Sequence, residues 1–437
     1  DSSADMPLER IAPGARVAVL GMGLTFYDIV AALTTGRGGQ FREGPDKALR
    51  YLPSGLEPVL VAGSRSGVPL PARGLNQKGP LWRYTARLFT PERVAALRAP
   101  GRPLDFRARI WPWLHAEMQL VYYATAVRAR LGERAEQEFL TRAASLVESA
   151  AAHAADDIIR AAATELGVDG LPPLDVDGLA RPFAGRSFDS PAAFSAALGQ
   201  VIDEDLQHAG LGNFHGPRKA ALDVLRDVRG TIRRAVDFDG LTAASHRDDF
   251  LGWFAPLSSF LAAGPPAQRL RQTRALLEAG VLRVAGPSAE FAADEASGYF
   301  TVRSPQVAGS LHHCEALVDA RIPAPDLDRD TAPLTRHLRD TGLWTPWAND
   351  RGDGGSVTGG VATTASPYRP VTATGTAAEG VYVLGIPSEG QRWFMQVGSA
   401  RPGPWTDFTR DADTIAQDAL AALPRPAAHR TLEGTRA

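Results

Sequence analysis

The apolar positions near the start of the chain follow the order of a strand, a tight turn, a helix and a second strand. Arg16 to Leu20 (RVAVL) form a short apolar run that meets glycines at once, and residues 24–36 then show helical spacing that ends at Gly36. Glycine and charged residues at 36–55 predict a loop, and a second strand is predicted over 58–62. This order predicts the front of a βαβ unit.

The pattern changes from about Pro91 to Gly280, where long Ala, Arg and Leu-rich stretches predict a mainly helical region. Beyond it, the sequence predicts strands at 281–286, 298–304, 315–323 and 380–386, helices at 332–341 and 411–423, and a Gly/Thr-rich loop at 351–375. Strands on both sides of a helical block predict an α/β, Rossmann-like protein with a large mainly helical insertion.

Composition narrows the possible partners. A chain of 437 residues with 44% hydrophobic and 22% charged residues can hold two or three domains, and a net charge of −2 favours neither nucleic acid nor a membrane surface as a partner. The single cysteine, Cys314, excludes an internal disulfide and a redox-active cysteine pair. No apolar stretch reaches the length of a membrane span and no signal-like start is present, so we expect a cytoplasmic protein with a small-molecule substrate.

The glycine turn after the first strand predicts a nucleotide site. Gly21 permits a tight turn, Gly23 allows the backbone to approach a pyrophosphate, and the following helix points its N-terminus at that anion. Phe26 replaces the third glycine of the usual motif, so a plain glycine turn in an α/β domain is the alternative. The candidate cofactor-binding residues here are Gly21, Met22, Gly23, Leu24 and Thr25.

The residues after the second strand predict which nucleotide binds. Ser64, Arg65 and Ser66 place an arginine between two hydroxyls, which suits the 2′-phosphate of NADPH, and no acid is present to bind a free ribose. The alternative is a solvated arginine, because the spacing from Gly21 to Arg65 exceeds the customary ~20 residues.

The sequence gives little support for a metal site or a nucleophilic serine. The nine histidines lack metal-ligand spacing, so no metal site is expected, and no G-x-S-x-G elbow occurs. No catalytic acid or base is identified. Glycines interleaved with Trp393, Phe394 and Trp405 after the strand at 380–386 suit close approach to a flat polar ring, and a tight connection packed by aromatics is the alternative.

Four separated segments, at 21–41, 51–72, 316–323 and 381–405, together resemble the bacterial FAD/NAD(P)-binding protein family that includes flavin-dependent amine N-monooxygenases. The resemblance spans nearly the whole chain. It implies a flavoprotein with two dinucleotide-binding domains, FAD and NADP as cofactors, and molecular oxygen as a co-substrate. The FAD fingerprint of such proteins precedes the nicotinamide motif and is absent from this sequence, so we expect a missing N-terminal segment. A relative that has lost flavin is the alternative.

The resemblance also implies roles for parts of the chain. Residues 1–90 would bind NADP, 91–280 would form the helical insertion or substrate domain, 281–330 would return to the α/β core, and 331–437 would close the flavin site. In this last segment, the implied flavin-side residues are Gln396, Val397, Gly398 and Ser399.

The reaction implied by the resemblance is N-oxygenation of a small amino acid, with L-aspartate as the first candidate. An acidic amino acid needs cations for its carboxylates, for which arginine is suited. The candidate substrate-binding residues are Arg107, Arg109, Arg392 and Arg401. Two alternatives stay open, namely a non-catalytic nucleotide-binding module and a flavin-dependent NADPH dehydrogenase or reductase.

Overall fold

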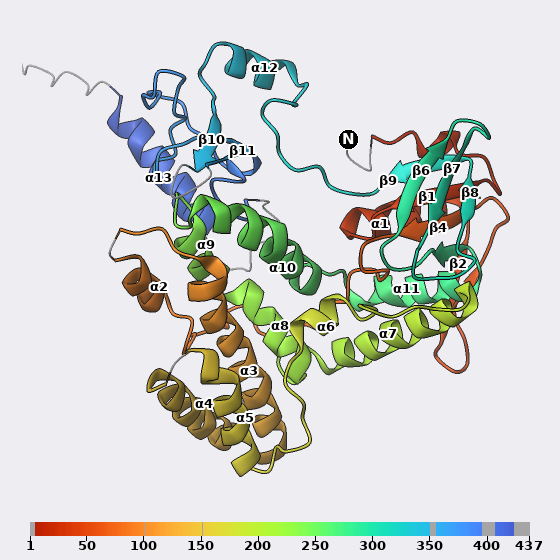
Figure 1. The fold of residues 1–437 in the computed structure, drawn as a ribbon, viewed down its shortest axis with the longest axis horizontal. Helices are drawn as coiled ribbons and strands as arrows, with labels where there is room; N and C mark the ends of the chain where they lie inside the picture. The colour runs from red at the N-terminus through yellow and green to blue at the C-terminus, as the bar shows by residue number, and fades with distance from the viewer. Residues whose placement is uncertain (1–4, 100, 151, 350–354, 396–406, 424–437) are drawn as a thin grey trace, which may run out of the picture. The chain divides into compact units, whose positions relative to one another are not determined.

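The computed structural model describes residues 5–99, 101–150, 152–349, 355–395 and 407–423, which form two compact units (Figure 1). Unit 1 comprises Asp1–Ile232 and Ser245–Pro323, and unit 2 comprises Arg233–Ala244 and Ala324–Ala437. Each unit is described by itself below. None of the helices in the described part of the chain combines the length and apolar character needed to cross a bilayer.

A four-stranded parallel sheet forms the centre of the α/β part of unit 1. Its strands, in spatial order, are β5 (Leu282–Val284), β4 (Val59–Gly63), β1 (Arg16–Leu20) and β9 (Ala316–Asp319). The central strands β1 and β4 are continuous apolar runs because helices or strands cover both of their faces. Their carboxyl ends lie at one edge of the sheet, where Leu20 pairs with Gly63. The predicted α/β class is confirmed.

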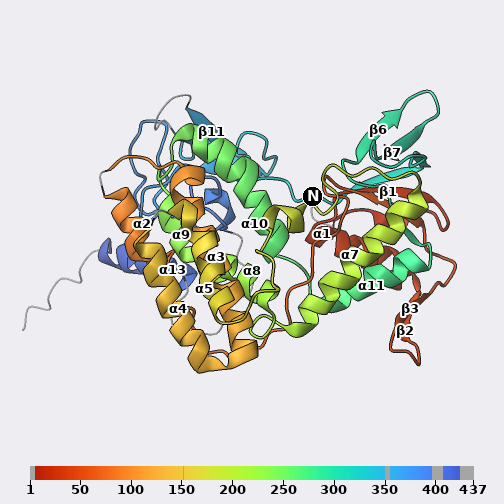
Figure 2. The same cartoon turned by 60° about the horizontal axis from the view of Figure 1, so that its bottom comes forward.

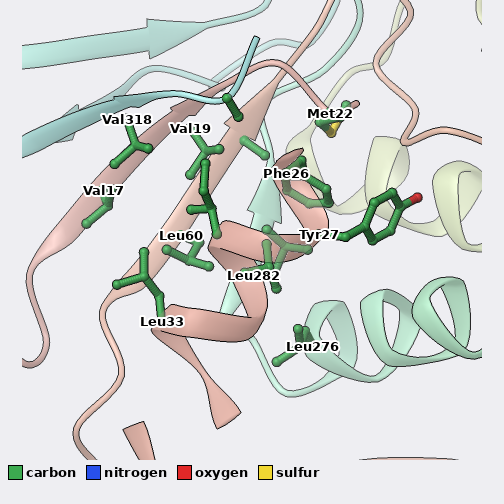
Figure 3. Packing of buried hydrophobic residues seen from close by; sticks show 14 of the residues in the cluster. Val17, Val19, Met22, Phe26, Tyr27, Leu33, Leu60, Leu276, Leu282 and Val318 are labelled. Carbon is green, nitrogen blue, oxygen red and sulfur yellow. The ribbon is translucent and has the colours of Figure 1, made fainter. Parts of the chain in front are cut away.

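Helix α1 (Leu24–Leu33) covers one face of this sheet. Its buried residues Phe26, Ile29, Val30 and Leu33 recur at helical spacing and pack against β1 and β4 (Figure 3). Burial of each such side chain contributes about 1.5–3 kcal/mol. The helix that follows the glycine turn is therefore held firmly by the core.

Helices α7 (Pro191–Leu211) and α11 (Ala267–Glu278) lie side by side next to this part of unit 1 (Figures 1 and 2). Leu276 of α11 joins the same hydrophobic cluster as α1. The helical region is thus packed directly onto the α/β core.

The opposite face of the parallel sheet is covered by a three-stranded antiparallel sheet of β6 (Glu290–Asp294), β7 (Tyr299–Arg303) and β8 (His312–Cys314). Val302 and Cys314 pack there against Ala18 and Val61. The sequence pattern predicts β7 but misses β6, whose residues are mostly exposed.

The predicted loop at 36–55 is wrong, because this stretch contains an antiparallel hairpin of β2 (Gln40–Glu43) and β3 (Leu49–Leu52). Its turn uses Lys47 with a positive φ of 61°. Phe41 and Tyr51 pack across the two strands with ring centroids 4.9 Å apart. Charged residues on the exposed face of this hairpin concealed the strand alternation.

The helical stretches predicted between 91 and 280 are present. They run between β4 and β5, and Figure 1 shows α3, α4 and α5 packed alongside one another. Besides α7 and α11, the elements are α2 (Pro91–Arg98), η3 (Phe106–Ile110), α3 (Trp111–Leu131), α4 (Glu133–Glu148), η4 (Ala152–Ala154), α5 (Ala155–Glu165), α6 (Val176–Ala180), α8 (Pro217–Asp227), α9 (Arg229–Val236), η5 (Ser245–Phe254) and α10 (Ala255–Ala262).

Unit 2 contains a two-stranded antiparallel sheet of β10 (Pro346–Asn349) and β11 (Ser356–Val361). Its helical elements are α12 (Pro333–Asp340), η6 (Ile386–Ser388) and α13 (Asp407–Ala421). The helices at 332–341 and 411–423 are therefore confirmed, although α13 begins earlier than predicted. The predicted loop at 351–375 is wrong in part, because it contains β11.

The predicted strand at 380–386 is also wrong. The chain makes no strand ladder there, and η6 begins at Ile386. Gly380 and Gly385 both have positive φ, and Pro387 lacks an N–H, so the segment cannot join a sheet over its length. Val383 is buried, whereas Leu384 and Ile386 are 40% and 51% exposed.

Candidate coenzyme-binding cavity

The predicted glycine turn follows β1 and leads directly into α1. Gly21 has a φ of +100° and donates its N–H to the carbonyl oxygen of Gly63 at 2.9 Å, which holds the turn against the end of β4. Gly23 is the N-cap of α1 and provides no side-chain acceptor for the first helical turn. The amide groups at the start of α1 are therefore suited to an anionic ligand.

The space around the two glycines differs. A Cβ at Gly21 would lie 2.9 Å from Cγ of Arg321, whereas a Cβ at Gly23 would meet no atom within 4 Å. Gly21 is thus needed for the turn itself. The open space beside Gly23 is what close approach of a pyrophosphate requires.

A short loop with two hydroxyl groups follows β4. The hydroxyls of Ser64 and Ser66 lie 3.4 Å apart, and the Ser64 hydroxyl accepts the N–H of Gly67 at 3.2 Å. Arg65 between them is exposed, and its guanidinium makes no hydrogen bond or ion pair within the described residues.

The two predicted nucleotide-binding segments border one cavity of about 720 Å³, which is within the usual range for a cofactor site. Met22, Gly23, Ser64, Arg65 and Ser66 line it, whereas Gly21, Leu24 and Thr25 belong to the same turn but do not line it. The other lining residues are Val68, Leu70, Asp177, Ala180, Arg181, Phe183, Ala184, Gly185, Gly252, Trp253, Pro256, Leu257, Phe260, Pro287, Ser288, Ala289 and Gln306.

About half of the cavity wall comes from the helical region, which the sequence reasoning did not connect with the nucleotide site. Trp253, at the end of η5, packs edge-to-face against Trp111 with ring centroids 5.0 Å apart. No pattern in the sequence pointed to Trp253. No local motif could have revealed this wall, because it is assembled from segments far apart in the chain.

The predicted substrate-binding arginines of unit 1 lie outside this lining. Arg107 is 57% exposed, lies 3.8 Å from a carboxylate oxygen of Asp249, and its guanidinium lies 4.1 Å from the centroid of the Trp253 ring. Arg109 is exposed on the same π-helical segment, η3. Arg107 therefore contacts a wall residue of the cavity, Trp253, without lining the cavity itself.

Arg392 lies in unit 2 and is buried. Its Nη2 donates to Asp411 at 2.6 Å, its guanidinium lies 4.1 Å from the centroid of the Tyr368 ring, and the Tyr368 hydroxyl also donates to Asp411, at 2.7 Å. Burial raises the pKa of the neighbouring Asp237 to about 6, against the opposing effect of Arg233. A substrate-binding role for Arg392 stays a prediction.

The remaining predicted residues, Gln396, Val397, Gly398, Ser399 and Arg401, lie outside the described residues. In the adjoining described part, Gly390 has a φ of +105°, and a Cβ there would lie 2.6 Å from the hydroxyl oxygen of Thr358. Packing inside unit 2 is thus enough to explain this glycine. Within the described ranges, no group of three His, Cys, Asp or Glu side chains is arranged to hold a metal ion.

The sequence was compared with protein-family models and with curated proteins to find its relatives. No family model matches the chain. It is 42% identical, over 98% of its length, to an L-aspartate N-monooxygenase (nitrosuccinate-forming) of Streptomyces cremeus, and 41% identical, over 96%, to one of Streptomyces davaonensis. It is also 39% identical, over 96%, to a nitrosuccinic acid synthase of Aspergillus oryzae. The predicted family resemblance is confirmed. The chain spans 62–64% of the length of these relatives.

Proposed function

We propose that the protein is an NADPH- and FAD-dependent monooxygenase that oxygenates the amino group of L-aspartate. The observation that carries the coenzyme part is the cavity of unit 1, which brings the glycine turn and Arg65 to one site. The reaction and substrate rest on the relatives, whose names describe nitrosuccinate formation from L-aspartate.

The described residues of the cavity fit a dinucleotide with a 2′-phosphate. The open space beside Gly23 and the N-terminus of α1 would receive the pyrophosphate, and Arg65 with Ser64 and Ser66 would bind the 2′-phosphate. When bound, the coenzyme supplies a hydride. The apolar side chains of Phe183, Leu257 and Phe260 would exclude water from the site.

FAD is proposed from the family resemblance. The glycine turn after β1 is assigned to the nicotinamide coenzyme, and the described residues provide no second turn of this kind for a flavin pyrophosphate. We assign Gln396, Val397, Gly398 and Ser399 to the flavin side, within a segment 331–437 that closes the flavin site. In this division, the NADP-binding domain of a protein with two dinucleotide-binding domains comprises residues 1–90 and the returning strands at 281–330. Residues 91–280 form the helical insertion or substrate domain.

The substrate would present two carboxylates and an amine. Arg107, Arg109, Arg392 and Arg401 remain the candidates for the carboxylates, because guanidinium groups bind carboxylates bidentately. The amine must lose its proton before it can be oxygenated, so the rate is expected to rise with pH up to the apparent pKa of the bound amine.

The proposal is tested by supplying the full-length protein with NADPH, L-aspartate and ¹⁸O₂. We expect NADPH oxidation coupled to a product that carries ¹⁸O on its nitrogen, detected by mass spectrometry, and a visible absorption spectrum of bound flavin. L-Asparagine is a matched control, because it lacks one carboxylate. NADPH oxidation that yields only hydrogen peroxide with L-aspartate would contradict the substrate assignment, and a colourless, folded protein would contradict the flavin.

A further inference from the structure

A segment of the helical region, residues 181–188, forms part of the cavity wall beside the Arg65 loop. It follows α6 directly, and Arg181, Phe183, Ala184 and Gly185 line the same cavity as Arg65. This wall segment therefore gives the cavity a second arginine, one that does not come from the α/β core.

Gln306 ties the wall segment to the Arg65 loop. Its Nε2 donates to the carbonyl oxygens of Phe183 and Arg186 at 3.2 and 2.6 Å, and its Oε1 accepts the hydroxyl of Ser288 at 3.1 Å. The N–H of Ser288 in turn donates to the carbonyl oxygen of Arg65 at 3.0 Å. The two arginine-bearing segments are thus linked by a continuous chain of hydrogen bonds.

Arg181 resembles Arg65 in its surroundings. It is exposed, and its guanidinium makes no hydrogen bond or ion pair within the described part of the chain. Asp177 is the one acid among the described lining residues, and it forms no ion pair with Arg181. Two uncompensated guanidinium groups on one cavity favour a ligand with a concentrated negative charge, such as a phosphate monoester.

We propose that Arg181 is a second specificity-determining residue, which binds the coenzyme 2′-phosphate together with Arg65, and that Gln306 is the positioning residue that holds its segment. This inference rests on the proposed use of NADPH. The 2′-phosphate is favoured over the pyrophosphate because the hydrogen-bond chain leads to the backbone of Arg65 after β4, whereas the pyrophosphate belongs to the glycine turn after β1.

Equilibrium binding of two probes to the full-length protein tests the inference. The probe 2′,5′-ADP carries the 2′-phosphate, and 5′-AMP lacks it. Arg181→Ala is expected to weaken 2′,5′-ADP binding about tenfold or more while 5′-AMP affinity changes less than about twofold. Arg134→Ala is the control for loss of one arginine charge, because Arg134 on α4 is 92% exposed and does not line the cavity, and it should change neither affinity.

The outcomes separate this inference from the proposed function. Equal weakening of both probes by Arg181→Ala, or no weakening at all while Arg65→Ala does weaken 2′,5′-ADP, overturns the role of Arg181 and leaves NADPH use intact. If the unaltered protein binds 2′,5′-ADP no better than 5′-AMP, the proposed coenzyme fails and this inference fails with it.

The role of Gln306 is tested by a double-mutant cycle on the same ratio of affinities. If Gln306 acts through Arg181, Gln306→Ala lowers the 2′,5′-ADP preference, but adds little when Arg181 is already alanine. Additive losses in the double variant would overturn the positioning role.

Discussion

The two units of the chain use arginine in opposite ways. Arg65 and Arg181 line the cavity of unit 1 with no protein anion bound to them in the described residues. Arg392 of unit 2 is 3% exposed and donates to Asp411 at 2.6 Å. A guanidinium that lines a cavity without an ion pair is available to bind a ligand. A buried guanidinium that is paired with a carboxylate contributes mainly to the stability of the fold. Burial and ion pairing therefore separate ligand-binding arginines from structural ones, which the sequence alone does not.

The largest expected effect of this difference is on the stability of unit 2. Arg392→Ala should lower the free energy of unfolding by about 3–5 kcal/mol, because it leaves the buried carboxylate of Asp411 without its cation. Urea unfolding followed by circular dichroism measures this change. An Arg392→Ala protein as stable as the unaltered one would show that the pair is not structural.

A second test of the buried network uses pH. Burial raises the pKa of Asp237 from its ordinary 3.8 to about 6, so the folded state binds this proton more tightly than the unfolded state. The resulting stability is fully present below the unfolded pKa and is lost as pH rises through the folded pKa, by up to about 3 kcal/mol between pH ~4 and ~6.

Asp237→Asn removes this titration. The unaltered protein should lose stability as pH rises from ~4 to ~6, whereas Asp237→Asn should not. Urea unfolding of both proteins should therefore show the free energy of unfolding of the variant, minus that of the unaltered protein, increasing with pH across this window. A stability difference that is independent of pH would mean that Arg233 and Arg392 keep the Asp237 carboxylate ionised throughout.

The smaller expected effect concerns Arg65 and appears in coenzyme choice. Arg65→Ala removes a charge-assisted contact of about 1.5–3 kcal/mol, so NADPH should bind about tenfold or more weakly while NADH changes little. Because Arg65 is exposed, stability should change by no more than about 0.5 kcal/mol. Steady-state kinetics with both coenzymes measures the ratio, and equal loss with NADPH and NADH would make Arg65 a merely electrostatic or structural residue.

The sequence predicts well the local structure at the sheet edge that borders the cavity. The apolar run at 16–20, the helical spacing of Phe26, Ile29, Val30 and Leu33, and the strand before Ser64 specify short-range structure, and they place Met22, Gly23 and Arg65 at one sheet edge. Parallel strands place their carboxyl ends together whatever lies between them in the chain.

The other half of the site could not be predicted in this way. Arg181, Trp253 and Gln306 come from three separated segments, and hydrophobic periodicity contains no information on which helix end meets which loop. The apolar segment at 380–386 shows the converse error, because two glycines with positive φ and Pro387 override its strand-like composition. In both cases, contacts between distant parts of the chain or local backbone geometry determined the structure, and the hydrophobic pattern did not reveal it.

The claim that the cavity of unit 1 holds the nicotinamide coenzyme is tested most directly at Gly23. A valine there would fill the space in which no atom lies within 4 Å of a Cβ, at the N-cap of α1. Gly170→Val is the matched control, since a Cβ at Gly170 also meets nothing within 4 Å and Gly170 does not line the cavity. Direct titration of the two folded variants with NADPH should show binding lost in Gly23→Val and retained in Gly170→Val. Unchanged NADPH affinity in a folded Gly23→Val protein would contradict the account.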